Sequence, residues 1–331
     1  MTAASRSDDL TWVLTDGTIG MQVQCLGLAT AAGLTPIVKR IEPSLLLRLF
    51  PRLGEAPGIT AAAGGDPLVA PWPDVVISCG RRTAGAALAI RRKAAADPTN
   101  TAPPPLLAHI QDPRIDPNVF DLLVVPLHDP ARGPTVVNTL GALNPHDPAR
   151  LSAAAEALDP AIQDLSRPRI AVSVGGSNKR YDFSSDAVER FISDLRHLAQ
   201  SSGAALLVAT SRRTDTATRK ALAEGLADVP GWVWTGEGEN PYLGFLGLAD
   251  AIVVTSDSVN MVSEACATGK PVMVATVEIE TGRLAAFHDR LRDAGLTRPF
   301  TGELEVYNYE PLNETARVGE LLKEKLKARR G

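Results

Sequence analysis

The sequence is short of cysteine, of basic charge and of metal-binding patterns, and each shortage excludes a class of protein. Its three cysteines, Cys25, Cys79 and Cys266, are odd in number and fall in predicted strands or helices. They indicate small core residues in a reducing compartment, and not a disulfide framework or a metal site. A general nucleic-acid binder normally carries a basic surface, and the formal net charge of −4 argues against this class of protein. There is no zinc-type ligand spacing and no Asp-x-Asp motif, so no metal is expected.

Long apolar runs are also missing, since none approaches the roughly 18 residues that a membrane-spanning helix needs. The first ten residues are polar and acidic and do not resemble a signal peptide. We therefore expect a cytoplasmic protein, which meets a membrane only at its inner face. The 331 residues, 44% of them hydrophobic, suffice for two globular domains.

The most informative stretch predicts a strand, Ala251–Thr255, a polar turn, a helix from Val259 to Thr268 and a second buried strand. A helix that begins at the carboxyl end of a parallel strand offers free amides and a positive dipole end to an anion. Glu264 lies about two turns into this helix, where its carboxylate can accept hydrogen bonds from a ribose diol. The candidate phosphate-binding residues of the turn are Ser256, Ser258 and Asn260. The alternative is a capped crossover helix with Glu264 in solvent.

A second phosphate-binding candidate is the glycine-rich turn that follows the predicted strand Arg169–Val174. Such a turn exposes backbone N–H groups, and the cation of Lys179 can neutralise a diphosphate. Its residues are Gly175, Gly176, Ser177, Asn178 and Lys179.

The first half of the chain opens with a predicted strand, Thr11–Thr15, and continues through a glycine turn into a helix, as doubly wound sheets do. Asp16 is a candidate general base, with a helix N-cap as the alternative. His109 lies near the carboxyl end of the predicted strand Leu106–Ile110 and is either a second candidate base or a hydrogen-bonded core histidine. The candidate acceptor-side residues at the same sheet edge are Gly17, Gly20, Arg81, Gln111, Asp112 and Arg114.

Two segments are candidates for contact with a membrane. Leu45–Leu53 is apolar and punctuated by arginines, so it can lie on a membrane surface or cover a lipid-linked acceptor. The alternative is packing against its own domain, with the arginines in solvent. The last helix, from Asn313, is rich in cations, which suit either an anionic surface or simply a helix C-terminus.

The segment Val262–Pro271 resembles the nucleotide-sugar half of the B-type glycosyltransferases, in which a turn holds the diphosphate and a helix glutamate binds the ribose. Over nearly its whole length the chain also resembles bacterial proteins similar to the plant mitochondrial fission factor called elongated mitochondria, which are generally regarded as nucleotide-sugar glycosyltransferases. The motifs that carry this second resemblance are Thr15–Gln24, Ile77–Arg81, His109–Arg114 and Gly175–Lys179.

Both resemblances imply an α/β protein of two Rossmann-like domains that face each other across a cleft. We expect an acceptor-side domain at residues 1–158, a nucleotide-sugar domain at 169–312, and a C-terminal helix at 313–331 that packs back on the first domain. The expected reaction is sugar transfer from a nucleoside-diphosphate sugar to an acceptor that is lipid-linked or part of the cell envelope. No cofactor or metal is needed, and Asp16 or His109 would deprotonate the acceptor. The alternatives are a non-catalytic scaffold that recruits a partner and a nucleotide-sugar epimerase.

Overall fold

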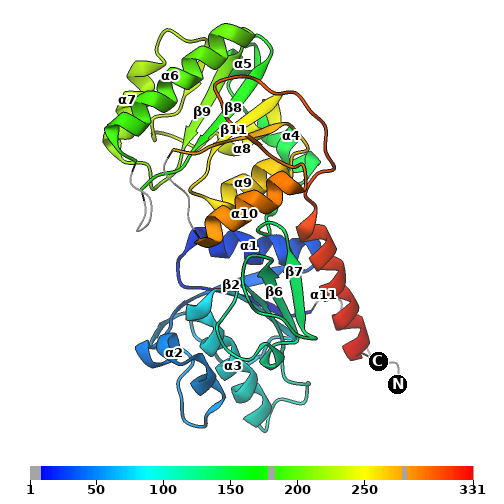
Figure 1. Ribbon diagram of the computed structural model, residues 1–331. Helices are drawn as coiled ribbons and strands as arrows, with labels where there is room; N and C mark the ends of the chain where they lie inside the picture. The colour runs from blue at the N-terminus through cyan, green and yellow to red at the C-terminus, as the bar shows by residue number, and fades with distance from the viewer. Residues whose placement is uncertain (1–8, 178–182, 278–281, 331) are drawn as a thin grey trace. The chain divides into compact units, whose positions relative to one another are not determined.

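The computed structural model describes residues 9–177, 183–277 and 282–330 and divides into two compact units (Figure 1). The first unit comprises residues 1–145 and 313–331, and the second comprises residues 146–312. Each unit is an α/β layer structure built on a parallel sheet, as the alternation of apolar runs and glycine turns predicts.

Among the described residues, the first unit forms a seven-stranded sheet in the order β3-β2-β1-β4-β5-β6-β7. All neighbours pair in parallel except β3, which runs antiparallel to β2. The strands are β1 Thr11–Thr15, β2 Pro36–Glu42, β3 Gly64–Gly65, β4 Val75–Cys79, β5 Leu106–Ile110, β6 Leu122–Pro126 and β7 Val136–Thr139. The helices are α1 Ile19–Ala31, α2 Leu45–Leu49, α3 Arg81–Ala96 and α11 Glu314–Arg330, with short 3-10 turns η1 Pro51–Glu55 and η2 Pro117–Val119.

Alternation along the central strands gives this sheet two apolar faces. Trp12 and Leu14 of β1 point into a core shared with α3, whereas Val13 points into a second core. That second core includes Val318 and Leu322 of α11. The C-terminal helix therefore packs on the first unit, beside α1.

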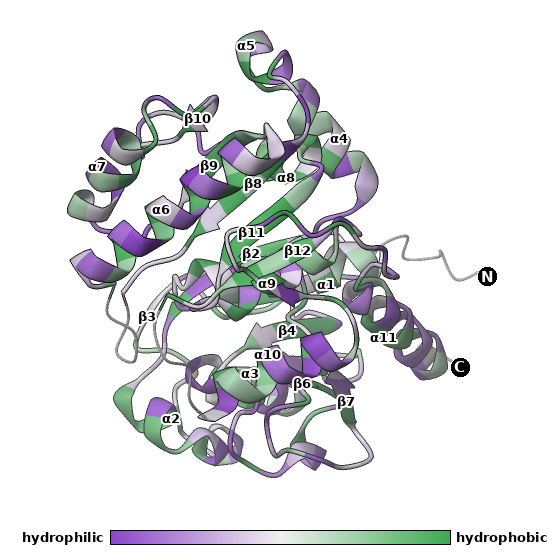
Figure 2. Cartoon of the chain, turned by 45° about the horizontal axis from the view of Figure 1, so that its top comes forward, coloured by the Kyte–Doolittle hydropathy of each residue, from purple (hydrophilic) through white to green (hydrophobic). Residues whose placement is uncertain are grey.

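The described part of the second unit forms a six-stranded sheet in the order β10-β9-β8-β11-β12-β13, and all of its pairs are parallel. Its strands are β8 Arg169–Val174, β9 Ala205–Thr210, β10 Gly231–Val233, β11 Ala251–Thr255, β12 Val272–Ala275 and β13 Arg298–Pro299. Its helices are α4 Pro148–Glu156, α5 Pro160–Gln163, α6 Ser185–Ser202, α7 Thr216–Gly225, α8 Tyr242–Leu248, α9 Val259–Cys266 and α10 Gly282–Asp293. Strands β8 and β11 are mostly apolar and almost entirely buried, and α6 carries one apolar stripe (Figure 2).

The division between the units falls earlier than the expected end of the first domain at residue 158. Helix α4 packs against α8 of the second unit, and glycines make this approach possible. A Cβ atom on Gly247 would lie 2.2 Å from the carbonyl oxygen of Leu151, and one on Gly244 would lie 2.7 Å from that of Ala154. Residues 146–158 therefore belong to the second unit because α4 has its packing surface there.

Two further expectations concern membranes and cysteines. Across the described residues, every helix is either too short or too polar to span a bilayer. Cys25, Cys79 and Cys266 are all buried and free. Burial and the neighbouring Cys25 raise the pKa of Cys79 well above its usual range, so this thiol remains protonated and unreactive.

Candidate functional site

A cluster of polar turns in the second unit lies at the carboxyl edge of its sheet. Strands β9, β8 and β11 are neighbours, and each ends in a polar or glycine-rich turn. These turns are Ser211–Thr214, Gly175–Ser177 and Ser256–Ser258. Ligands of open α/β sheets bind at this edge. The cluster therefore sits where a nucleotide is expected.

A single carboxylate joins the three turns. Asp257 Oδ1 accepts a hydrogen bond from Thr255 Oγ1 at 2.7 Å, and Oδ2 accepts one from the Gly176 amide at 3.2 Å. Arg213 pairs with the same Oδ2 at 2.6 Å. The Asp257 side chain is 2% exposed, whereas that of Arg213 is 39% exposed. Arg213 therefore neutralises a buried charge and still presents donors to solvent.

The two glycines after β8 are needed for this arrangement. A Cβ on Gly175 would lie 2.0 Å from Asp257 Oδ1, and one on Gly176 would lie 2.2 Å from the Arg213 carbonyl oxygen. The Gly175 amide donates to Thr255 Oγ1 at 2.8 Å. Both glycine amides are thus engaged inside the protein, which differs from the expectation that they face a phosphate. Ser177 accepts a hydrogen bond from the Phe183 amide, and Asn178 and Lys179 lie outside the described residues.

Helix α9 supplies the other anion-binding groups. The Ser258 hydroxyl accepts a hydrogen bond from the amide of Met261 at 3.4 Å, and the positive end of the helix dipole lies at this turn. Asn260 and Glu264 are four residues apart and share its partly exposed face, opposite the buried Val262. Ser256 is buried, and its carbonyl oxygen pairs with His288 Nε2 at 2.8 Å. Ser256 thus holds the turn in place, while Ser258 caps the helix.

Glu264 is fixed by a hydrogen bond from one residue of its own unit and has a second residue of that unit nearby. The Tyr242 hydroxyl donates to Glu264 Oε2 at 2.6 Å, and His146 Nε2 lies 3.7 Å from Oε1. Burial and the adjacent Glu264 charge raise the pKa of Tyr242 well above its ordinary value, so the hydroxyl stays a donor. Each carboxylate oxygen has a further acceptor position, and the Glu264 side chain is 13% exposed. Glu264 can therefore still accept hydrogen bonds from a diol.

Asp16 follows β1 at the carboxyl edge of the first sheet. It accepts a hydrogen bond from the Thr18 amide and pairs with Arg82 at 3.2 Å. Burial alone would raise the pKa of Asp16, but the hydrogen bonds from Thr18 and the Arg82 guanidinium outweigh burial and lower it. The N-cap of α1 is Thr18 and not Asp16. The carboxylate is therefore ionised and fixed at neutral pH.

Four of the acceptor-side candidates follow β4 or β5, and the two glycines follow β1. Arg81 begins α3 and donates to the Leu49 carbonyl oxygen at 2.7 Å. Gln111 and Arg114 are both left-handed, with φ of 72° and 58°, which is uncommon for residues other than glycine. Asp112 accepts a hydrogen bond from the Arg114 amide. Gly17 also has positive φ, and Gly20 lies in the first turn of α1.

His109 is fully buried within β5. Its Nδ1 pairs with Ser78 Oγ at 2.7 Å, and its ring stacks on Phe120 with centroids 4.7 Å apart. Burial lowers the pKa of His109 to about 3. The structure therefore favours the core-histidine interpretation over a catalytic base.

This burial predicts an acid-dependent stability. The unfolded state binds a proton on His109 below about pH 6.5, whereas the folded state excludes it down to about pH 3. In that window the free energy of unfolding should fall by about 1.4 kcal/mol per pH unit from this residue alone as the pH is lowered. Urea denaturation of the wild type and of His109→Gln between pH 7 and pH 4 isolates the effect. A difference between the two proteins that does not change with pH would contradict it.

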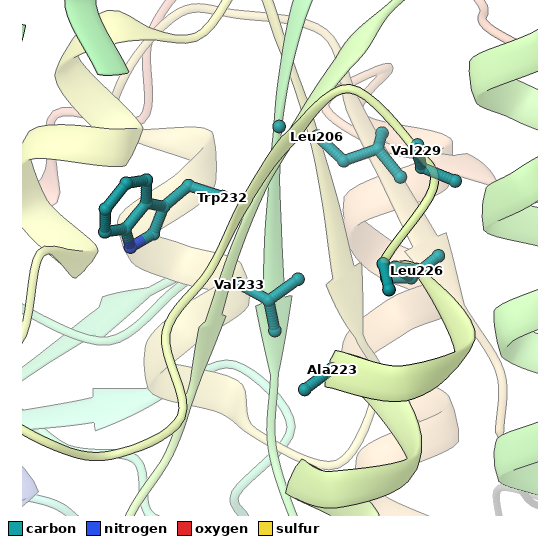
Figure 3. Close-up of a pocket in the computed structure, with 8 residues that line it drawn as sticks. Leu206, Ala223, Leu226, Val229, Trp232 and Val233 are labelled. Atoms are coloured by element: carbon teal, nitrogen blue, oxygen red, sulfur yellow. The ribbon is translucent and has the colours of Figure 1, made fainter. Parts of the chain in front are cut away.

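A cavity of about 240 Å³ in the second unit lies apart from these strand ends (Figure 3). Its lining residues come from α7, from the loop after it, from the amino end of β9 and from the whole of β10. The indole of Trp232 points away from Ala223 and Leu226 on the other side of the cavity (Figure 3). None of the strand-end turn residues lines it, so it is not the candidate site. No cluster of His, Cys, Asp or Glu suited to a metal occurs in the described parts of the chain.

The sequence did not predict four residues of this site, which are Tyr242, His146, Asp257 and Arg213. Arg213 lies in a polar strand-end turn, which is a usable signal. Tyr242 and His146 reach Glu264 only through tertiary packing, and the local sequence contains no sign of either contact.

Comparisons with known proteins bear on the whole chain. A family model described as "Mitochondrial fission ELM1" matches residues 19–326. The mitochondrial fission protein ELM1 of Arabidopsis thaliana is 32% identical over 284 residues, which cover 78% of this chain and 65% of that protein. The matched region thus spans less than two thirds of that relative.

Solved structures show the same fold at low identity. UDP-GlcNAc 2-epimerase from Methanocaldococcus jannaschii is 12% identical with a TM-score of 0.58, over 95% of this chain and 98% of that one. The Neisseria meningitidis UDP-GlcNAc 2-epimerase bound to UDP-GlcNAc is 15% identical with a TM-score of 0.54, over 96% and 99%. The two-sheet architecture is therefore that of the B-type glycosyltransferase-like fold, and this likeness establishes fold alone.

Proposed function

The chain belongs to the mitochondrial fission ELM1 family, and from this premise and the site geometry we propose that its second unit binds a nucleoside-diphosphate sugar and that the protein transfers the sugar. The observation that carries the proposal is the arrangement at the start of α9: the helix begins two residues after Asp257, the partner of Arg213, and it carries Glu264 about two turns along. The distance from the start of α9 to Glu264 is similar to the distance between the phosphate and the ribose hydroxyls of one nucleotide. The Neisseria epimerase, which has the same fold, is described as bound to UDP-GlcNAc.

The proposed binding mode assigns one role to each group. The first-turn amides of α9 and the half-exposed guanidinium of Arg213 receive the diphosphate oxygens. The carboxylate of Glu264, fixed by the Tyr242 hydroxyl at 2.6 Å, accepts the ribose hydroxyls. Because Asp257 already fills the turn at Gly175, the diphosphate lies against α9 and not within that turn. Asn178 and Lys179 remain sequence-based candidates for the same diphosphate.

The proposed chemistry is glycosyl transfer to a hydroxyl group. The bond between the anomeric carbon and the diphosphate oxygen breaks, and a bond from the acceptor oxygen to that carbon forms. The acceptor proton passes to a base, for which we propose Asp16, and the α9 amides with Arg213 stabilise the charge of the departing diphosphate. The strand-end residues Arg81, Gln111 and Arg114 of the first unit are the proposed acceptor surface. The scheme uses no metal and no cofactor beyond the donor.

Two other functions compete with transfer. Epimerisation of a sugar nucleotide is the reaction for which the UDP-GlcNAc 2-epimerases of the same fold are named. The name of the Arabidopsis relative, a mitochondrial fission protein, favours a scaffold without catalysis.

Product analysis separates the three functions. The protein is incubated with a panel of uridine, guanosine, adenosine and thymidine diphosphate sugars, with and without a cell extract as the acceptor source. Transfer predicts free nucleoside diphosphate that rises well above background only with the extract, and a loss of this activity in Asp16→Asn. A new sugar epimer without extract supports the epimerase, and no product together with no nucleotide binding supports the scaffold.

A further inference from the structure

The segment at the carboxyl end of β2 exposes four large apolar side chains in a row. Leu45, Leu46, Leu49 and Phe50 are between 45% and 67% exposed. The three leucines lie along one side of α2 and Phe50 is its C-cap, whereas Leu47 alone in this helix turns inward to the core. In a helix that packs on its own domain the apolar stripe faces inward, and here most of it faces solvent. We call these four side chains the apolar ridge.

The backbone under the ridge is firmly anchored on α3. Leu47 and Pro51 pack on Gly85, and a Cβ on Gly54 would lie 2.1 Å from the Gly85 carbonyl oxygen. Arg81 donates to the Leu49 carbonyl oxygen at 2.7 Å, and Arg92 donates to that of Gly54 at 3.1 Å. The outward direction of the ridge is therefore set by tertiary packing and does not arise from a loose loop.

Cations border the ridge. Arg48 and Arg52 are exposed within the segment, and Arg81 is held to its backbone. Against these stands Glu55, which lies 3.8 Å from Arg52. Arginines therefore outnumber carboxylates along residues 45–55, in a chain whose net charge is −4.

From this pattern we propose that the ridge docks the first unit on an anionic lipid bilayer. Apolar side chains flanked by arginines match the bilayer boundary, where acyl chains lie beneath phosphate-bearing headgroups. A second copy of the chain is a poorer occupant, because a two-fold contact through the ridge would bring Arg48 and Arg52 of both copies together. The basic C-terminal helix fits a bilayer less well. It buries Val318 and Leu322 in the core, and its Lys323 pairs with Glu320 at 2.6 Å.

Vesicle flotation tests the docking without any nucleotide, so its outcome is independent of the proposed transfer reaction. The vesicles are phosphatidylcholine with or without about one-third phosphatidylglycerol. The wild type should float with the anionic vesicles. The triple variant Leu45→Ser, Leu49→Ser and Phe50→Ser should bind them about tenfold more weakly or worse, because binding grows with the apolar area that enters the bilayer. Arg48→Glu with Arg52→Glu should weaken binding to anionic vesicles more than to neutral ones.

The matched control is Val69→Ser with Val306→Ser, which removes two other exposed apolar side chains and should leave flotation unchanged. Thermal melts confirm that each variant is folded. The proposal is overturned if the wild type binds no vesicles, or if the triple variant floats like the wild type. It is also overturned if light scattering shows a dimer that the triple variant abolishes while vesicles bind neither protein.

Discussion

Replacing Glu264 by alanine is expected to weaken binding of a nucleoside diphosphate about 10- to 100-fold, the range that loss of a charged hydrogen-bond acceptor produces. In the proposed site this carboxylate accepts the ribose hydroxyls, and the Tyr242 hydroxyl fixes its position at 2.6 Å. Calorimetric titration with uridine, guanosine, adenosine and thymidine diphosphates measures the effect on whichever nucleotide binds.

Two companion variants separate binding from folding. The alanine variant also leaves the buried Tyr242 hydroxyl without its acceptor, so some stability will be lost. Glu264→Gln keeps an oxygen for Tyr242 but offers one acceptor group instead of two, and should bind weakly while it melts close to the wild type. Glu239→Ala removes an exposed carboxylate of the same unit and should change neither property. If both Glu264 variants bound the nucleotide with wild-type affinity, Glu264 would not be a ligand of the ribose.

Replacing Asp257 by alanine is expected to lower the free energy of unfolding by about 2–4 kcal/mol. The change leaves the Gly176 amide and Thr255 without their acceptor and opens a cavity beside Gly175. It also leaves Arg213 without its counter-ion, although the partial exposure of this guanidinium moderates the cost. Urea denaturation monitored by circular dichroism gives the value.

Asp228 supplies the matched comparison, because it forms a carboxylate–arginine pair of similar length in the same unit. Its bond to Arg196 measures 2.5 Å, against 2.6 Å for Asp257 and Arg213, but the Asp228 side chain is largely exposed. Asp228→Ala should therefore destabilise far less than Asp257→Ala. Equal losses would mean that Asp257 does not hold the three turns together.

The fold was largely predictable because its signals are local. Buried parallel strands are short apolar runs, and the predicted strands Thr11–Thr15, Arg169–Val174 and Ala251–Thr255 are confirmed at the same residues. The helix after Ser258 also begins where its capping residue predicts, and it ends at Cys266, two residues before the expected end. The family resemblance is confirmed by the match over residues 19–326.

The site was less predictable because its contacts join distant segments. The glycine pair at Gly175 looked like a phosphate turn, yet its missing side chains make room for Asp257, which comes from another strand end. The sequence predicted His109 near the carboxyl edge of the sheet, where a ligand could reach it. In the structure its ring packs on Phe120 and is completely buried. Leu45–Leu53 had two interpretations, and only the tertiary structure shows that Leu47 alone of its first leucines is buried.

Amide hydrogen exchange with and without the bound nucleotide tests the central claim most directly, because it reports on the amides that are proposed to hold the diphosphate. The account predicts slower exchange in peptides that cover Ser256–Glu264 and Ser211–Thr214, with smaller changes elsewhere in the second unit. Unchanged exchange in both peptides, under conditions where calorimetry shows a saturated nucleotide site, would contradict it.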